Sequence, residues 1–197
     1  LDFDNLTEEN IYVLDSPILT NSQFKKFKKF FSKKVKTIDC TFDIDKSLKD
    51  RVDLIREEAE TAVREGSTCL VLSDKNISNQ KASIPSILTV GAVHSHLVKH
   101  GLRGYCSLNV ECSDAMDTHS FAILIGVGAT TVNPYLSIDS IYQRFEKKLF
   151  GQYDFETCVK KFKKSIDAGL LKIMSKMGIS VISSYRGGCN FEAVGLS

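Results

Sequence analysis

The chain has 197 residues, a length typical of one domain that buries roughly 70% of its unfolded surface. Lys and Arg number 26 against 24 Asp and Glu, and this near balance argues against nucleic acid as the main partner. Apolar residues make up 43% of the chain, and no apolar run approaches the roughly 20 residues that cross a bilayer, which argues against a membrane protein.

The six cysteines predict a reduced, intracellular chain. They are scattered, and they include no Cys-x-x-Cys pair that would indicate a metal or iron–sulfur site. Four of them fall inside apolar segments, where a free cysteine packs as a small hydrophobic residue: Cys40, Cys69, Cys106 and Cys158. Residues 1–4 lack an initiator methionine and the features of a signal peptide, so we expect a fragment of a longer protein.

Apolar and β-branched segments alternate with helix-like patterns along most of the chain. Residues 1–34 are polar to mixed, so we expect a helical or irregular lead-in to an α/β body at residues 35–197. The segments predicted as strands are short, and they comprise residues 35–42, 68–72, 105–110, 130–132 and 179–182. Amphipathic patterns with capping signals predict helices at residues 47–66, 85–100, 117–127, 138–149 and 155–177.

This alternation predicts a parallel sheet whose strands are joined by right-handed helical crossovers. Four or five such units fit either a doubly wound sheet or an incomplete (β/α) barrel, and periodicity alone does not separate the two. In both architectures the functional side chains gather at the carboxyl ends of the strands. Here the predicted strand ends supply polar residues that include Asp43, Asp74, Glu111, Asn133 and Tyr185.

Two carboxylates at these strand ends, Asp74 and Glu111, form a candidate acid–base pair. The alternative is structural, and in that case each carboxylate caps the helix that follows or makes an ion pair with Lys75 or Arg186. We favour the structural interpretation, because carboxylates at strand ends are common in such folds.

The glycine pair Gly187 and Gly188 is a candidate anion site. It follows a predicted strand and precedes residues 190–194, which we expect to be helical, so backbone amides there would point at a bound phosphate. A tight turn is the simpler interpretation. If the glycine pair works together with Asp74 and Glu111, the chain is a self-contained (β/α) enzyme that binds a phosphorylated ligand.

Four histidines raise the question of a zinc site. His96 and His100 lie one helical turn apart, as two metal ligands would, whereas His94 points to another side of the same helix. The glutamate of a His-Glu-x-x-His motif is missing from this helix. We therefore expect hydrogen-bonded structural histidines and no metal site, with His119 satisfied by a neighbouring strand.

A basic segment at residues 25–36 contains seven lysines interleaved with phenylalanines, a pattern that can bind single-stranded nucleic acid. Phe24, Phe27 and Phe31 share one helical face, however. We therefore expect these rings to be buried and the lysines to form the opposite, solvated face. A nucleic-acid-binding module is kept as an alternative.

Ordered sequence pieces across most of the chain resemble one known family. They are DSPILT at residues 15–20, TIDCTF at 37–42, LSD at 72–74, IPSIL at 84–88, AVHSHL at 92–97, GLR at 101–103, VE at 110–111, HSFA at 119–122, IGVGA at 125–129, VNPYL at 132–136, GLLKIMSKMGIS at 169–180 and FEAVGL at 191–196. Their order and spacing resemble the C-terminal part of the central domain of the glutamate synthase large chain, up to its junction with the flavin-binding domain.

The resemblance implies an incomplete (β/α)-barrel-like (TIM-barrel-like) domain without catalytic, cofactor-binding or metal-binding residues. In that family an amidotransferase domain releases ammonia from glutamine. A flavin domain with FMN and an iron–sulfur cluster then makes glutamate from 2-oxoglutarate, with NAD(P)H or ferredoxin as electron donor. The central domain links the two and helps to wall the ammonia tunnel.

The expected partners are therefore the amidotransferase and flavin domains of the same chain, with a small electron-input subunit or domain as a further candidate. Neither nucleic acid nor a membrane is expected, and the expected location is the cytoplasm or a plastid. The family motifs cover polar residues that we expect to make interdomain or structural contacts: Asn133, Tyr135, Lys172, Lys176, Tyr185 and Arg186.

The chain departs from the family pattern at two places. Ser95 stands where the family has a third consecutive histidine, and residues 188–190 (GCN) replace the usual Ala-Gln-Ile at the junction with the flavin domain. The earlier part of the central domain is also missing. We therefore expect exposed apolar patches and a tendency of the chain to associate.

Overall fold

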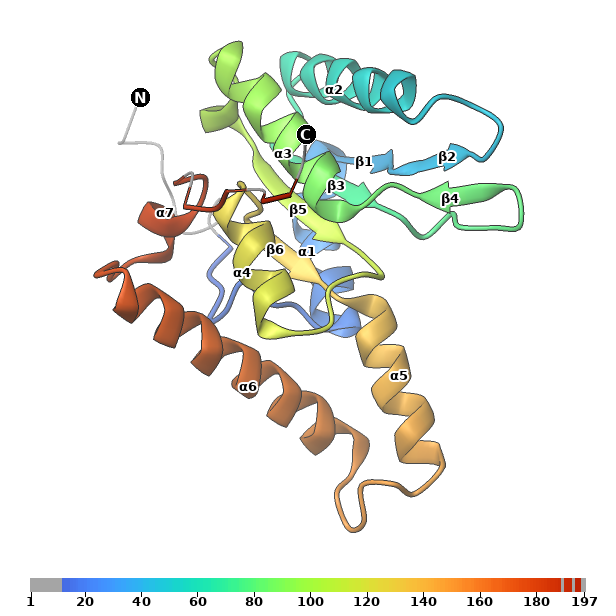
Figure 1. Ribbon diagram of the computed structural model, residues 1–197, viewed down its shortest axis with the longest axis vertical. Helices are drawn as coiled ribbons and strands as arrows, with labels where there is room; N and C mark the ends of the chain where they lie inside the picture. The colour runs from blue at the N-terminus through green and yellow to red at the C-terminus, as the bar shows by residue number, and fades with distance from the viewer. Residues whose placement is uncertain (1–11, 189, 193, 196–197) are drawn as a thin grey trace.

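A parallel four-stranded sheet forms the centre of the chain in a computed structural model that describes residues 12–188, 190–192 and 194–195 (Figure 1). The strands are β1 (Val35–Asp39), β3 (Cys69–Ser73), β5 (Ser107–Glu111) and β6 (Thr131–Asn133), in the spatial order β1-β3-β5-β6. All neighbouring pairs are parallel, as the alternation of strands and helices predicts.

The segment predicted as one strand at residues 35–42 forms two strands in two different sheets. The prediction is correct for residues 35–39 and wrong beyond them. β1 pairs with β3 as far as Asp39, and β2 (Thr41–Asp43) then pairs antiparallel with β4 (Lys81–Ser83). Cys40 is the crossing point, because its N–H donates to Ser73 O at 2.8 Å and its carbonyl accepts from Ile84 N at 2.9 Å. The β-branched pattern continues without a break from β1 into β2, so the sequence pattern does not reveal that the pairing partner changes.

Helices cover both faces of the sheet, because successive side chains of a strand point to opposite faces. Leu70 and Leu72 of β3 belong to the main core, which lies under α2 (Leu48–Arg64), α3 (Ser86–Lys99) and α4 (Thr118–Gly126). Cys69 and Val71 point to the other face and pack in a second cluster with Leu19, Phe24 and Phe27, the last two from α1 (Asn21–Phe31). The expected burial of Phe24 and Phe27 is confirmed.

The lead-in before α1 continues the sheet beyond β6. The N–H of Leu19 donates to Val132 O at 2.9 Å, and the N–H of Val132 donates to Pro17 O at 2.8 Å. The edge of β6 is therefore covered by residues 17–19, and the polar lead-in is part of the packed body. A short 3-10 turn, η3 (Ser32–Lys34), then leads from α1 into β1.

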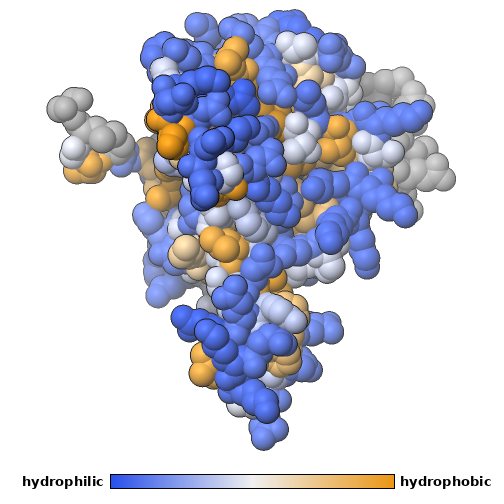
Figure 2. All heavy atoms as spheres, turned by 90° about the vertical axis from the view of Figure 1, so that its right-hand side faces the viewer, coloured by the Kyte–Doolittle hydropathy of each residue, from blue (hydrophilic) through white to orange (hydrophobic). Residues whose placement is uncertain are grey.

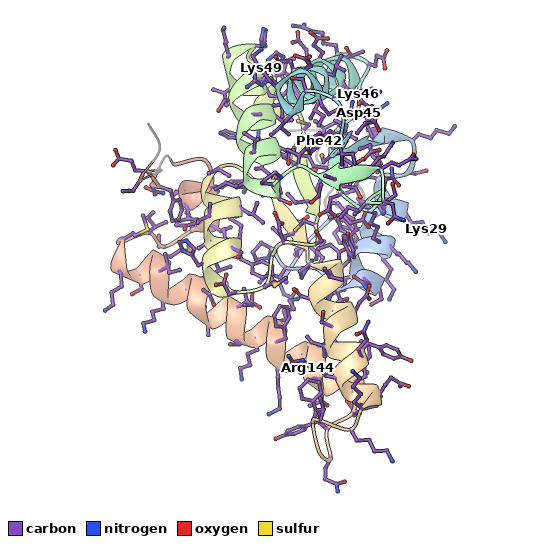
Figure 3. The ribbon with its side chains drawn as sticks, turned by 45° about the vertical axis from the view of Figure 1, so that its right-hand side comes forward. Lys29, Phe42, Asp45, Lys46, Lys49 and Arg144 are labelled. Carbon is purple, nitrogen blue, oxygen red and sulfur yellow. The ribbon has the colours of Figure 1, made fainter. Side chains whose placement is uncertain are left out.

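The long helices after β6 form a projecting arm. α5 (Tyr135–Glu146) starts three residues earlier than predicted, because Pro134 occupies the position before its first residue. It turns back into α6 (Phe155–Lys176), whose second half packs along α4 (Figure 1). The far end of the arm is mainly hydrophilic (Figure 2), and Arg144 lies on it, at the opposite end of the molecule from Lys46 and Lys49 (Figure 3).

The strand predicted at residues 179–182 is wrong. Gly178 has a φ of 69°, and the N–H of Ile179 donates to Met174 O at 2.9 Å, so these residues close the end of α6. Val181 is 52% exposed, and Ile182 begins the short helix α7 (Ile182–Tyr185). The segment is apolar because Ile179 and Ile182 pack against the core from outside the sheet.

Five cysteines of the described residues are free and buried, which confirms the expected packing role of Cys40, Cys69, Cys106 and Cys158. Burial raises the pKa of Cys69 to about 11, so its thiol stays protonated and unreactive at neutral pH. Cys189 lies outside the described residues. Within that same part of the chain, no helix is both long and apolar enough to cross a membrane.

Candidate functional site

A row of polar residues crosses the carboxyl edge of the sheet, where the chemistry of such folds is usually found. Asp39, Ser73, Glu111 and Asn133 are the last residues of their strands, and the register places each beside the next. All four side chains therefore lie at one edge because the strands are parallel and end at the same level.

Glu111 lies inside this row, and its carboxylate forms ion pairs with two lysines. It is 4% exposed, and its carboxylate lies 2.9 Å from Lys75 Nζ and 3.5 Å from Lys28 Nζ. Ser73 Oγ donates a further hydrogen bond to it at 2.8 Å. Burial alone would raise the pKa of Glu111, but the hydrogen bonds from Lys75 and Ser73 and the charge of Lys28 outweigh it and hold the pKa below its ordinary value.

Asp74 lies next to Glu111 but makes a different set of contacts. Its Oδ2 accepts from Ser113 N at 2.9 Å and from Ser113 Oγ at 2.6 Å, so it ties the start of the following loop to the sheet. Its Oδ1 is buried without a hydrogen-bond partner among the residues described. The predicted ion pair with Lys75 is confirmed for Glu111, whereas Arg186 lies at the opposite edge of the sheet and pairs with neither carboxylate.

The two predicted contact residues at this edge are held by the body of the chain. Asn133 is buried, and its Nδ2 donates to Leu19 O at 2.9 Å and to Asn21 Oδ1 at 3.0 Å. Tyr135 is partly exposed, and Lys75 Nζ lies 5.0 Å from the centre of its ring. Burial, together with the nearby carboxylate of Asp74, raises the pKa of Tyr135, so its phenol stays protonated at neutral pH.

The remaining predicted contact residues lie elsewhere. Tyr185 is fully buried, and its hydroxyl donates to Ala122 O at 3.0 Å. Arg186 is partly exposed and reaches Thr130 Oγ1 at 3.3 Å, just before β6 begins. Lys172 and Lys176 are exposed on α6. The structure therefore separates the six residues, with Asn133 and Tyr135 at the carboxyl edge and the others towards the amino edge and α6.

A cluster at the amino edge also contains Arg103, which the sequence patterns did not reveal. Its side chain donates to His94 Nδ1 at 3.1 Å and to Gly128 O at 2.8 Å. Because Nδ1 accepts, His94 is neutral, and burial followed by the charges of Arg103 and Arg186 lowers its pKa. A Cβ at Gly128, where φ is 129°, would lie 2.3 Å from the His94 ring, so only glycine fits there. The expected structural role of His94 is confirmed.

The glycine pair forms a turn and not the start of a helix. Gly187 has a φ of 68°, and the N–H of Gly188 donates to Tyr185 O at 3.2 Å. Residues 190–192 and 194 are not helical, so the helix predicted at residues 190–194 is wrong wherever the structure describes it. The tight turn favoured from the sequence is therefore confirmed, and the alternative of a phosphate site at a helix amino terminus loses its structural basis.

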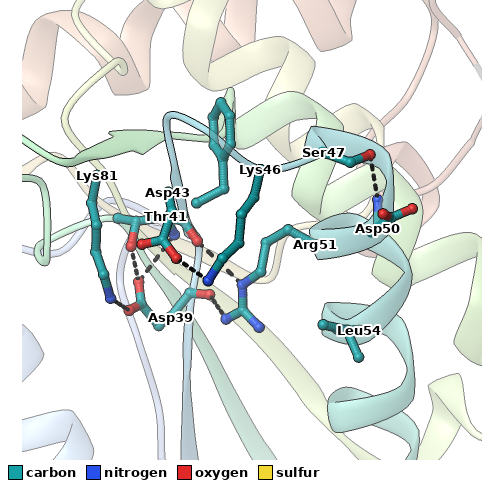
Figure 4. A pocket seen from close by; sticks show the side chains of 10 residues that line it. Asp39, Thr41, Asp43, Lys46, Ser47, Asp50, Arg51, Leu54 and Lys81 are labelled. Carbon is teal, nitrogen blue, oxygen red and sulfur yellow. Dashed lines mark hydrogen bonds and ion pairs between the residues drawn. The ribbon is translucent and has the colours of Figure 1, made fainter.

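A cavity of about 500 Å³ beside the β2–β4 pair was not predicted (Figure 4). Lys81 faces Asp39 with a separation of 3.8 Å, and Lys46 pairs with Asp43. Arg51 of α2 points between them, and its guanidinium donates to the main-chain carbonyls of Thr41 and Asp39. Charged side chains of both signs therefore line the cavity, together with Phe42 and Leu54. Of these residues, only Asp43 was singled out from the sequence, at the end of a predicted strand.

Comparison with known proteins shows the family. The family model described as "Glutamate synthase central domain" matches residues 3–197. The chain belongs to this family. It is 50% identical over 194 residues to the glutamate synthase [NADPH] large chain of Azospirillum brasilense, covering 97% of the chain and 13% of that protein. It is 42% identical to the large chain of Bacillus subtilis, covering 93% of the chain and 12% of that protein.

The central domain therefore spans only about an eighth of the length of these relatives. Two solved structures share its fold. DHODH from Eimeria tenella matches with a TM-score of 0.52 and 15% identity, covering 80% of this chain and 38% of that one. A flavocytochrome b2 mutant matches with a TM-score of 0.53 and 14% identity, covering 89% of this chain and 41% of that one. Both are (β/α)-barrel flavoenzymes, which confirms an incomplete barrel-like fold and, at such low identity, nothing beyond the fold.

Proposed function

We propose that this chain is a non-catalytic central domain that holds a glutamine amidotransferase domain and a flavin domain of a glutamate synthase in register. The parent enzyme would be an oxidoreductase that makes L-glutamate from L-glutamine and 2-oxoglutarate in nitrogen assimilation, and this domain would help to wall its ammonia tunnel. The observation that supports a non-catalytic role is the state of Glu111. A carboxylate bound by two lysines is a poor proton carrier at neutral pH.

The cofactors of the proposed parent enzyme would lie in other parts of the protein. FMN and an iron–sulfur cluster are assigned to the flavin domain, and electrons would come from NAD(P)H or ferredoxin. Relatives of this chain carry names with each kind of donor, including NADPH in Azospirillum brasilense, NADH in Schizosaccharomyces pombe and ferredoxin in Pyropia yezoensis. Chloroplastic relatives exist as well, so the proposed location is the cytoplasm or a plastid.

The surface that would touch neighbouring domains is narrower than the sequence suggested. Asn133 and Tyr185 are buried by the chain's own residues, so they would act by holding the local backbone. Tyr135, Lys172, Lys176 and Arg186 retain exposed atoms and are the proposed contacts. Arg186 is the best supported of these candidate contacts. Within the described residues it has no carboxylate partner, and its guanidinium donates only to a hydroxyl.

The test is to replace Arg186 or Lys176 by alanine in the whole glutamate synthase. If the domain keeps the two active sites coupled, glutamine hydrolysis should continue while less glutamate forms, so the ratio of hydrolysis to synthesis should rise. Lys99→Ala is the matched control, because Lys99 is an exposed helical lysine outside the proposed surface. If the two rates stay matched in both variants, the assignment of these contacts is wrong.

A second measurement addresses the non-catalytic role itself. The isolated chain should convert none of the substrates of the parent enzyme, and it should purify without flavin or a phosphorylated metabolite. A turnover that disappears in Glu111→Gln would instead identify a self-contained (β/α) enzyme, since that substitution removes the charged carboxylate and keeps its shape.

A further inference from the structure

Two histidines and one glutamate from separate helices come together on the surface of the body. Glu60 lies on α2, and His96 and His100 lie one turn apart on α3. Glu60 Oε2 is 2.6 Å from His96 Nε2 and 3.8 Å from His100 Nδ1, and all three residues offer ligand atoms within 4.8 Å of one another. The glutamate that α3 lacks in its own sequence is therefore supplied by the neighbouring helix.

We propose that Glu60, His96 and His100 form a zinc site that cross-links α2 to α3. Imidazole nitrogen and carboxylate oxygen are ordinary zinc ligands, and a set of two histidines and one carboxylate leaves a further position for water. Zinc bonds of about 2.0 Å at tetrahedral angles place ligand atoms about 3.3 Å apart. The observed separations lie on both sides of this value, so small side-chain rotations bring the three atoms to a shared ion.

The supporting structure holds these ligands in place. α2 and α3 pack against each other through buried residues that neighbour the ligands in sequence, Ala59 and Leu97, both fully inaccessible to solvent. The other oxygen of Glu60 accepts from Arg64 at 2.7 Å, which fixes the plane of the carboxylate.

In the absence of metal, the two histidines of the cluster form hydrogen bonds that zinc would have to replace. His100 Nδ1 lies 2.8 Å from His96 O, and His96 Nε2 is hydrogen-bonded to Glu60 Oε2 at 2.6 Å. Zinc would replace both of these hydrogen bonds. The positive charge of Arg64 opposes binding, so we expect a reversible site and not a permanently occupied one.

The test uses the 197-residue chain without a histidine tag, freed of metal by a chelator and titrated with zinc chloride by calorimetry. We expect one zinc ion per chain and a rise in melting temperature with zinc concentration. His100→Ala and Glu60→Gln should each weaken zinc binding by about tenfold or more and abolish the temperature shift. Both positions are partly exposed, so these variants should fold.

His119→Ala is the matched control, because His119 is an exposed helical histidine away from the cluster. It should bind zinc like the parent chain. Cobalt gives an independent readout, since Co²⁺ bound by this ligand set has visible absorption that His100→Ala should remove. The proposal is overturned if the parent chain takes up no zinc at millimolar concentration, or if His100→Ala and Glu60→Gln bind as tightly as the parent.

Discussion

Glu111 shows how a strand-end carboxylate becomes structural. Its strand ends at the position where catalytic carboxylates of barrel enzymes lie, yet Lys75 follows β3 and Lys28 extends from α1 to the same point. Both lysines precede the carboxylate in sequence, one on α1 and one just after β3, and together they link the lead-in, β3 and β5. The ion pairs therefore stabilise the arrangement of elements at this edge.

The first prediction concerns the pH dependence of this contribution. Glu111→Gln should lower the free energy of unfolding at pH 7 by about 1–2 kcal/mol, a value below that of a fully buried pair because both lysines are partly exposed. Since the folded pKa of Glu111 lies below the ordinary value of 4.5, its stabilisation is present above that pH and is lost as the pH falls through the lowered pKa.

Urea unfolding of both proteins between pH 7 and pH 3 would measure this difference. The difference in unfolding free energy between parent and variant should be constant near neutral pH and should become smaller in acid. Glu146→Gln is the control, because Glu146 is exposed on α5 and should show no difference at any pH. An equal difference for Glu111→Gln at pH 7 and pH 3 would contradict the lowered pKa.

At the scale of elements, the helices were predictable because their signals are local. Ser47 accepts from Asp50 N and starts α2 where the capping pattern placed it, and most of the apolar stripe of α6 is buried as expected. One error concerns partners distant in sequence, because Cys40 changes sheets by donating its N–H to Ser73 O and accepting from Ile84 N at its carbonyl. The other is local, because the N–H of Ile179 donates to Met174 O and closes α6 although the apolar neighbours of Ile179 look like a strand.

The candidate site was predictable only in part, for the same reason. Asp74 and Glu111 were identified from their place after apolar strands, but nothing local signals that Lys28, 83 residues before Glu111, would reach the carboxylate. Glu60 likewise meets His96 only because α2 and α3 pack side by side. Arg103 is found only through the fold, since it bonds two main-chain carbonyls and two side chains that are brought together by packing.

The packing of α6 on α4 gives the prediction at this scale. Leu170 is 3% exposed and belongs to the main core, whereas Leu171 beside it is 65% exposed. Leu170→Ala should therefore cost about 2–4 kcal/mol of unfolding free energy, through lost burial and a cavity. Leu171→Ala should change it by less than about 0.5 kcal/mol. Denaturant titration of the two variants measures both changes in unfolding free energy. Equal changes would mean that α6 does not pack on α4 in solution.

At the scale of the whole molecule, the two edges of the sheet differ. Residues 17–19 cover β6, but within the described part of the chain no strand pairs with the outer edge of β1. An uncovered edge presents unpaired backbone groups to other chains. Apolar side chains are also exposed in the segment that follows β1, with Ile44 66% and Leu54 54% accessible. In a complete barrel, another strand would occupy this position.

The isolated chain should therefore associate as its concentration rises, and β1 should be where it does so. Thr37 is exposed in the middle of β1, and Thr37→Lys should reduce association because a lysine on an edge strand disfavours pairing with another strand. Thr61→Lys adds the same charge on the exposed side of α2 and is the control. Sedimentation velocity over a range of concentrations measures the effect. A parent chain that stays monomeric throughout, or a Thr61→Lys variant that disperses as well as Thr37→Lys, would show that the open edge does not drive association.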